Sequence, residues 1–439
     1  MKAAQSMKQR LIAQSVQRKL KRLDREAEAG PWITDSAAGS RRTDFRQHPG
    51  WQQLNVMREG AKALGVEDPF FRVHEGCSGA TAVIDGRECI NFASYNYLGL
   101  SGDPRVIAAA QQAAADYGMS VSASRMVSGE RPIHRQLERA LADVYRADDA
   151  LAFVSGHATN VSVIGYLMGS RDLVLHDEYI HNSSLMGAQL SGARRMAFRH
   201  NNLEHLEKLL QQHRHQFDRV LVVVEGLYSM DGDTPDLAAL ATLKDAHDSW
   251  LMVDEAHALG VLGSTGQGSH EHADVDPSRI DIWMGTLSKT LSGCGGYIAG
   301  SQPLIDLLRH FAPGFLYSVG MPATIAAAAI ESLRILQAEP ERVQALQQNS
   351  EYLARQAKAA GMSTGSCMGR AVIPVISGSS VVATRQSVEL FRQGINVQPI
   401  LYPAVPEKSA RLRFFISSEH TPEQIDQTLA ALSALQPPS

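Results

Sequence analysis

Short apolar runs alternate with helical stretches through the middle of the chain, and this alternation constrains the fold more than any other feature. The runs are residues 150–154, 172–175, 219–224, 250–253 and 280–284. Short apolar strands joined through helices are typical of a parallel sheet that helices cover on both faces. The sequence therefore predicts an α/β fold with a mostly parallel sheet, whose ligand lies at the carboxyl ends of the strands.

Composition narrows the class of protein. The 439-residue chain is 44% hydrophobic and 20% charged, which provides for a large core and two domains. A formal charge of −4 lacks the basic excess that attracts nucleic acid. No run approaches the roughly 20 apolar residues that span a bilayer, and no secretory segment follows the first basic residues. The four cysteines lack the spacing of a zinc site. We expect a cytoplasmic protein that acts on small molecules, without a metal, a nucleic-acid partner or a membrane span.

The chain divides into four segments. Residues 1–50 are predicted to be a basic amphipathic extension and linker, because eight basic residues and one acidic residue occur through Arg25. This extension suits a surface segment, a docking helix for a partner or a transit peptide. Residues 51–104 are expected to join the small domain, 105–335 to form the large domain and 336–439 to form a smaller α+β domain. The small domain's predicted elements are a helix at 340–360 and strands at 371–376, 395–402 and 411–416.

Two strands of the predicted sheet end near an acid and an amine. Asp254 follows the strand at 250–253, and Lys289 lies just beyond the strand at 280–284. A buried aspartate keeps a pyridine nitrogen protonated, so that the ring accepts electrons from a carbanion, and a lysine can bind an aldehyde as a Schiff base. This pair favours pyridoxal 5′-phosphate (PLP) as cofactor, although each residue alone is more often a surface or loop residue.

A predicted phosphate site strengthens this interpretation. Ser155, Gly156 and His157 follow the first apolar run and open a helix, whose backbone N–H groups can bind a phosphate. Thr286 and Ser288 offer hydroxyl donors in the segment that leads to the lysine. A phosphate site combined with an acid and an amine points to PLP more specifically than any of these residues alone.

Four ordered motifs resemble those of the α-oxoamine synthases, a family of fold-type I PLP enzymes. They are NFASYNYLG at 91–99, SRMVSG at 124–129, DEAH at 254–257 and GTLSK at 285–289. The resemblance covers about residues 68 to 432. It implies a large domain with a seven-stranded, mostly parallel sheet and a smaller C-terminal α+β domain. Segments 70–75 and 122–130 look closest to synthases of polyketide and other secondary-metabolite pathways.

The resemblance also implies roles for individual residues. His181 matches the histidine that stacks on the pyridine ring, and His257 matches the residue that hydrogen-bonds the phenolic oxygen of PLP. Ser229 lies in a loop that lines the same site. Lys289, Asp254, His181 and His257 are therefore expected to be the catalytic residues.

Further residues are assigned to the substrate and to a second subunit. Arg413 matches the arginine that grips the amino-acid carboxylate, a task suited to a planar bidentate donor, and Asn96 is expected at the substrate site. Arg411 is expected to be a surface charge. Ser318 resembles the hydroxyl that reaches the phosphate of the other subunit's cofactor, which implies a homodimer with shared active sites.

Two positions depart from the family's pattern. Many relatives have an aromatic residue where this chain has His157, whose imidazole can still cover the edge of the ring. An alanine is common where this chain has Asn182.

The implied reaction is a decarboxylative Claisen-type condensation of glycine, alanine or serine with an acyl thioester, giving an α-aminoketone, carbon dioxide and a thiol. Lys289 would remove the α-proton, and His181 or a neighbouring donor would polarise the thioester carbonyl. The acyl donor is either acyl-CoA or an acyl carrier protein, and the carrier protein would suit the basic N-terminal helix as a partner.

Two other interpretations remain. An aminotransferase or another fold-type I PLP enzyme would share Lys289 and Asp254. A non-catalytic partner subunit is the third interpretation, and the joint presence of Lys289, Asp254, His257 and Arg413 argues against it.

Overall fold

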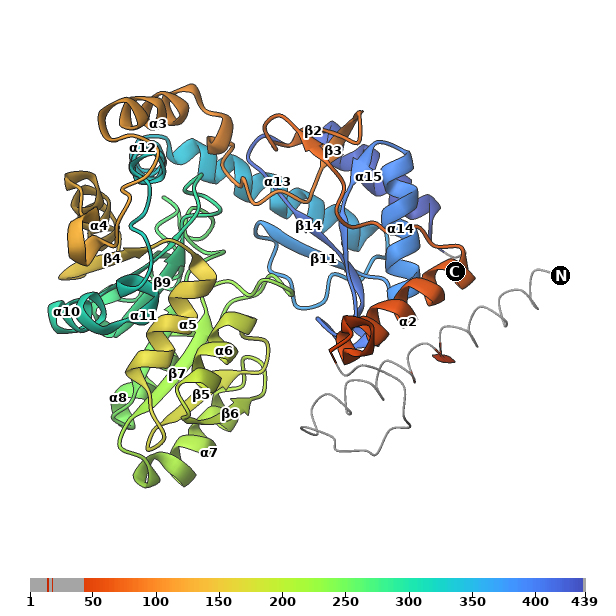
Figure 1. The fold of residues 1–439 in the computed structure, drawn as a ribbon. Helices are drawn as coiled ribbons and strands as arrows, with labels where there is room; N and C mark the ends of the chain where they lie inside the picture. Colours follow the sequence, from red (N-terminus) through yellow and green to blue (C-terminus); the bar gives the residue numbers. More distant parts are fainter. Residues whose placement is uncertain (1–13, 16–17, 19–42, 437–439) are drawn as a thin grey trace.

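The computed structural model describes residues 43–436 and, before them, residues 14, 15 and 18. Most of the predicted basic helix and the first part of the predicted linker, up to residue 42, lie outside the described residues. The described chain forms two lobes, one built on a large sheet and the other on two small sheets (Figure 1).

The large sheet has seven strands in the order β4-β10-β9-β8-β7-β5-β6. These strands are β4 (Asp149–Phe153), β5 (Leu173–Asp177), β6 (Arg194–Phe198), β7 (Val220–Glu225), β8 (Trp250–Asp254), β9 (Ile282–Thr286) and β10 (Gly296–Gly300). Only β10 runs antiparallel to its neighbours, β4 and β9, and the remaining pairs are parallel. The predicted mostly parallel sheet is confirmed.

The five predicted strands of this sheet are present, with ends that shift by one or two residues. The prediction missed β6 and β10. β6 is an edge strand with exposed side chains and two arginines, so it has no apolar run. β10 begins and ends with glycine, because Cβ atoms have no room there. At Gly296, a Cβ would lie 2.5 Å from Thr159 Oγ1. This close approach seats the start of α5 (Gly156–Leu167) on the sheet.

Helices cover both faces of the large sheet. Along β7, Val220, Val222 and Val224 pack into the core on one face, whereas Leu221 and Val223 pack into the core on the other. The first core also contains residues of α4 (Pro132–Val144), α7 (Leu203–His213), α8 (Leu237–Ala246) and α12 (Ala323–Ala338). The second contains residues of α5, α6 (Asn182–Leu190), α10 (Gln302–Phe311) and α11 (Pro313–Leu316). Burial on both faces explains why the strands read as continuous apolar runs.

The helix predicted after residue 103 is α3 (Pro104–Tyr117), which packs on α12. The Asp103 carboxylate accepts the Arg105 amide at 3.0 Å, and Pro104 occupies the first helical position. Gly118 ends the helix with a φ of 73°. Both predicted boundary signals are therefore used.

The second lobe holds two small sheets. The first, in the order β1-β2-β3-β12, is formed by β1 (His74–Glu75), β2 (Thr81–Ile84), β3 (Arg87–Asn91) and β12 (Ile395–Asn396). The second, in the order β11-β14-β13, is formed by β11 (Val372–Ile376), β14 (Arg411–Phe415) and β13 (Gln398–Ile400). The α-helices of this lobe are α2 (Pro49–Leu64), α13 (Pro340–Ala359), α14 (Ser380–Arg392) and α15 (Pro422–Ala434), whereas the short α9 (Ser269–His272) lies against Trp283 of the large sheet. β3 and β12 pair in parallel, so a segment from each end of the chain contributes to one sheet.

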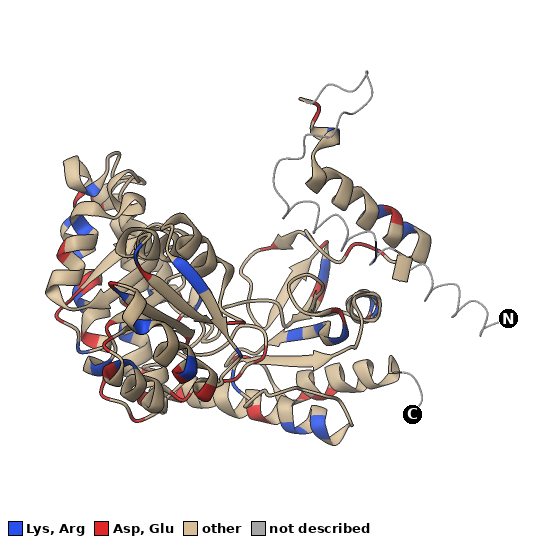
Figure 2. Cartoon of the chain, turned by 90° about the horizontal axis from the view of Figure 1, so that it is seen from below, with Lys and Arg blue, Asp and Glu red and all other residues tan. Residues whose placement is uncertain are grey.

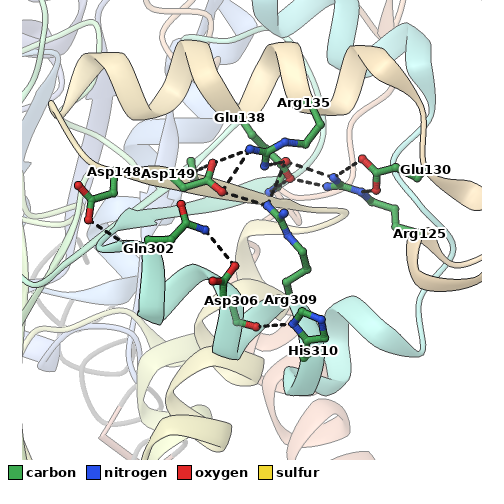
Figure 3. A network of polar contacts seen from close by, with 12 residues as sticks. Arg125, Glu130, Arg135, Glu138, Asp148, Asp149, Gln302, Asp306, Arg309 and His310 are labelled. Atoms are coloured by element: carbon green, nitrogen blue, oxygen red, sulfur yellow. Dashed lines mark hydrogen bonds and ion pairs between the residues drawn. The ribbon is translucent and has the colours of Figure 1, made fainter.

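A buried ionic network fixes the segment that carries the SRMVSG motif (Figure 3). Arg125 donates to Glu130 at 2.7 Å and also pairs with the fully buried Glu138 of α4. Asp149 of β4 accepts from Arg135 at 3.0 Å and from Arg309 of α10 at 3.2 Å. Three arginines and three carboxylates balance, which limits the cost of burying them. The network ties the motif to the edge of the large sheet.

Charged residues of both signs are interspersed over the described part of the chain (Figure 2). None of the helices within residues 43–436 combines the length and the apolar character that a bilayer crossing requires.

Candidate active site

Three neighbouring strands bring the predicted acid and amine together. β7 ends in Glu225, β8 ends in Asp254, and β9 ends in Thr286, three residues before Lys289. The parallel register sets Glu225 beside Asp254. The charges of Asp254 and Glu225 both act on the Lys289 amine. The amine therefore lies at the carboxyl ends of the strands, where the sequence placed it.

The environment of Lys289 favours its reactive form. Burial lowers its pKa to about 8, and the nearby Arg413 acts in the same direction, whereas Asp254 and Glu225 oppose the shift. Its Nζ lies 5.5 Å from the centre of the Tyr95 ring. A larger share of this amine is uncharged at neutral pH than for a surface lysine, and the uncharged amine is the form that attacks an aldehyde.

A chain of hydrogen bonds links Asp254 to His181. Asp254 is 4% exposed and accepts the Asn160 side-chain amide at 2.9 Å. The same amide nitrogen donates to Ser183 Oγ at 2.9 Å, and this hydroxyl lies 2.7 Å from His181 Nδ1. Partial loss of solvent, together with the charge of Lys289, lowers the pKa of His181, so its imidazole is neutral at neutral pH. Asp254 and His181 thus hold a fixed relation to each other.

His257 is held by a buried tyrosine. The Tyr97 hydroxyl, which is fully buried, lies 2.7 Å from His257 Nδ1. Burial raises the pKa of Tyr97 and, with the charges of Lys289 and Arg413, lowers that of His257 well below its usual value. A protonated tyrosine that donates to Nδ1 of a neutral imidazole leaves the ring proton on Nε2. Nε2 is then a donor, as a contact to a phenolic oxygen requires.

The start of α5 has the features of a phosphate cradle. Ser155 caps the helix by accepting the Ala158 amide at 3.3 Å, and the first turn of a helix leaves amides available to a ligand. A Cβ at Gly156 would lie 2.8 Å from Thr286 Oγ1, so only glycine fits this close approach. Beside it, the Thr286 hydroxyl donates to the Ser288 hydroxyl at 3.1 Å. The residues present therefore fit a phosphate.

His157 lies on the exposed side of the same site. Its ring is 6.5 Å from that of His181 and nearly perpendicular to it, at 82°. The imidazole is therefore set edge-on beside the predicted stacking histidine.

Two arginines of β14 reach the loop that carries Ser229. Arg413 donates to the Ser229 carbonyl at 3.0 Å, and its Nε is buried without a partner among the described residues. An unpaired donor of this kind fits a carboxylate ligand. Arg411 is 4% exposed and pairs with Asp231 at 2.7 Å, so its prediction as a surface charge is wrong. Arg411 and Arg413 are two positions apart on one strand, so their side chains lie on the same face of the sheet. That face contacts the loop that carries Ser229.

Two predicted residues are not joined to this cluster. Asn96 donates to the Ser78 carbonyl at 3.3 Å and accepts the Ser101 amide at 3.2 Å, so both ends of its side chain are used by neighbouring backbone. Ser318 lies between α11 and α12, and no hydrogen bond within residues 43–436 connects it to the phosphate cradle.

Sequence reasoning missed Glu225, Asn160 and Tyr97. Glu225 follows the apolar run at 219–224 exactly as Asp254 follows the next strand, so the rule that found Asp254 would also have found it. Tyr97 lies in a quoted motif, but its contact with His257 spans 160 positions and no local pattern reveals it.

Comparison with known proteins places this geometry in a family. Residues 87–432 match the family model described as aminotransferase class I and II. A putative 8-amino-7-oxononanoate synthase of Rippkaea orientalis is 40% identical over 81% of this chain and 92% of its own length. The 8-amino-7-oxononanoate synthase of Symbiobacterium thermophilum is 38% identical over 80% and 89%.

Solved structures with a similar fold point to the same family. A serine palmitoyltransferase of S. paucimobilis with a bound PLP–myriocin aldimine superposes with a TM-score of 0.84 at 32% identity, covering 88% of this chain and 97% of that one. A Sphingomonas wittichii serine palmitoyltransferase gives 0.84 at 31% identity, with the same coverage. The chain therefore belongs to the aminotransferase class I and II family, among its α-oxoamine synthases, and is a PLP-dependent acyltransferase with the fold-type I architecture.

Proposed function

We propose that the protein condenses glycine, alanine or serine with an acyl thioester, releasing carbon dioxide and a thiol and forming an α-aminoketone. One observation carries the proposal. The half-buried Lys289, beside Asp254 at the strand ends, is acted on by the positive charge of Arg413. Arg413 comes from the other lobe, and its Nε has no partner among the described residues. An amine, an acid and a carboxylate-binding donor in one place are what a reaction at the α-carbon of an amino acid requires.

Each side chain has a defined task in this proposal. Bound PLP supplies an electron sink for negative charge that develops at the α-carbon. Lys289 holds the cofactor and afterwards takes the α-proton on Nζ, for which its lowered pKa suits it. Asp254 would pair with the pyridine nitrogen, and His257 would donate from Nε2 to the phenolic oxygen. His181, neutral and fixed through Ser183, covers the ring and polarises the thioester carbonyl.

The remaining tasks concern orientation. The phosphate end of the cofactor is bound by residues of the phosphate cradle, namely Ser155, Gly156, His157, Thr286 and Ser288. Arg413 fixes the substrate carboxylate through its free Nε. Ser229 lines the same site, and its backbone joins the Arg413 guanidinium to the loop.

The amino acid is small in this proposal because the ring, His181 and Arg413 confine it from three sides. The relatives' names do not select one substrate. One structural relative is named for serine and a palmitoyl group, whereas the sequence relatives are named for 8-amino-7-oxononanoate. The acyl group is carried either by CoA or by a carrier protein. Asn96 is proposed to contribute to the substrate site by holding its loop in place.

A second copy of the chain completes the site in this proposal. Ser318 lies between Tyr317 and Val319, which are 87% and 48% exposed. The Gly320 amide donates to the Ala123 carbonyl at 2.9 Å, so this segment lies beside Met126 and Val127, also exposed apolar residues. A group of exposed apolar side chains of this kind is typical of a subunit interface. Its burial would bring Ser318 to the partner's phosphate.

The cytoplasm remains the proposed compartment. Cys77, Cys89, Cys294 and Cys367 are all free thiols, as a reducing environment favours.

The proposal is tested in two steps. PLP-loaded protein is first incubated with a panel of amino acids, and α-hydrogen exchange and cofactor absorbance identify the amino acid that binds. Acyl-CoA or acyl carrier protein is then added, and release of carbon dioxide is followed. We expect release only when the thioester is present.

The control is Lys289→Ala, which should lower turnover roughly a thousandfold because the proton-transferring amine is lost. Conversion of the cofactor to its amine form by an amino acid alone would instead identify an aminotransferase. A protein that binds no PLP would point to a non-catalytic subunit.

A further inference from the structure

Glu225 is a buried carboxyl with one oxygen in use. The residue is 3% exposed. Its Oε2 accepts the Ser229 amide at 3.0 Å, whereas Oε1 is buried and has no partner among the described residues. The amide of His181 acts on the same carboxyl. Glu225 is thus linked through backbone groups to two loops of the site, yet none of the tasks above uses it.

The position of Glu225 makes its charge important. It ends β7 beside Asp254 at the end of β8, and both carboxyls act on Lys289. Two neighbouring buried carboxyls do not ionise independently. Asp254 accepts two hydrogen bonds, from Asn160 and from the Ala256 amide, and Glu225 accepts one well-formed bond. Burial, followed by the charge of Asp254, raises the pKa of Glu225 to about 8.

An ionised Glu225 would oppose the function of its neighbours. A second negative charge beside Lys289 would stabilise the ammonium and reduce the share of reactive amine. A neutral Glu225 leaves Asp254 as the single anion of the two, free to face the pyridine nitrogen. It still accepts the Ser229 amide, because a carboxylic acid keeps a carbonyl oxygen.

We propose that Glu225 is a positioning residue that works as a neutral carboxylic acid, orienting the Ser229 and His181 loops while leaving Asp254 as the only anion beside Lys289. The proposal rests on the proposed function for its purpose. The protonation it requires is a property of the chain alone and can be tested separately.

Glu255 provides a matched control. It is also a fully buried carboxyl next to Asp254, and burial raises its pKa to about 7. Its contacts differ, because it binds the amide and hydroxyl of Ser269 and does not act on Lys289. Glu225→Gln and Glu255→Gln therefore each remove one buried acid, of which only the first faces the site.

The first experiment measures the proton itself. Infrared difference spectra of the full-length protein without cofactor are recorded between about pH 6 and about pH 10. We expect the wild type to lose a carboxylic-acid carbonyl band that is missing in Glu225→Gln and retained in Glu255→Gln. The band of Glu255 also titrates in this range and is identified by its absence in Glu255→Gln. If Glu225→Gln retains every carbonyl band that the wild type loses, the proposal is overturned.

The second experiment measures PLP affinity at neutral pH by fluorescence titration. Gln keeps the neutral charge and an acceptor for the Ser229 amide, so Glu225→Gln should bind within about twofold of the wild type. Glu225→Ala leaves that amide without its acceptor and should bind about tenfold more weakly. Equal losses in Gln and Ala would show that the negative charge is required and would refute the proposal. If the wild type binds no PLP, the proposed function fails while the infrared result still decides the protonation.

Discussion

At the scale of single residues, the site depends on polar partners that set the protonation and direction of its functional groups. Asn160 links Asp254 to Ser183, and Tyr97 fixes His257. These partners are buried, and each leaves a functional group with one usable orientation. Removing a partner should therefore alter chemistry more than stability.

Tyr97→Phe tests this expectation for His257. Loss of the hydroxyl frees the imidazole to exchange its proton between Nδ1 and Nε2, so the donor to the phenolic oxygen is present only part of the time. We expect about a tenfold fall in kcat/KM, a changed pH dependence of cofactor absorbance and about 1 kcal/mol of lost stability.

Tyr145→Phe is the matched control. It removes another buried hydroxyl, which lies 2.7 Å from Tyr297 Oη, so its stability loss should be similar while the absorbance profile stays unchanged. Equal effects of both variants on that profile would contradict the role of Tyr97.

At the scale of elements, the sequence revealed what depends on local pattern. The strand at 250–253 and the caps of α3 were predicted because burial on two faces and capping chemistry leave a local signature. β10 and the split of 395–402 into β12 and β13 were not, because β10 also pairs with β4 and β12 pairs with β3, and both of these partners lie far along the chain. Arg411 was misjudged for the same reason, since Asp231 lies 180 positions away.

The start of α5 offers a prediction at this scale. In Gly156→Ala the new Cβ would lie 2.8 Å from Thr286 Oγ1 and must displace either the helix start or the hydroxyl. Because the first helical amides and Thr286 together form the phosphate cradle, PLP affinity should fall at least about tenfold.

Gly165→Ala is the control on the same helix. Its Cβ would meet the Leu190 side chain at 3.2 Å, and the flexible tip of that side chain can move. Its affinity for PLP, measured by equilibrium titration, should match the wild type. A normal affinity in Gly156→Ala would show that phosphate binding does not depend on this contact.

At the scale of the whole molecule, a charged cluster joins the two lobes. His200 Nδ1 lies 2.9 Å from Asp177 at the end of β5, and Nε2 lies 3.0 Å from Asp233. Ser366, which precedes β11 of the other lobe, donates to the same Asp233 at 2.8 Å. An imidazole can donate to two carboxylates only when it is protonated. The hydrogen bonds to these carboxylates raise the pKa of His200 to about 10, against the effect of its partial burial.

The stability of the protein should therefore depend on pH through His200. A histidine whose pKa is about 10 when folded and about 6.5 when unfolded stabilises the fold fully below about pH 6.5, and the contribution is lost as the pH rises through about 10. His200→Gln should lower the free energy of unfolding in urea by about 2 kcal/mol at about pH 6 and by much less at about pH 10.5. His205→Gln is the control for loss of an imidazole, because His205 Nδ1 accepts the Arg199 amide and does not bridge two carboxylates. If the loss of unfolding free energy in His200→Gln does not shrink with rising pH, the neutral imidazole, and not the cation, joins the lobes.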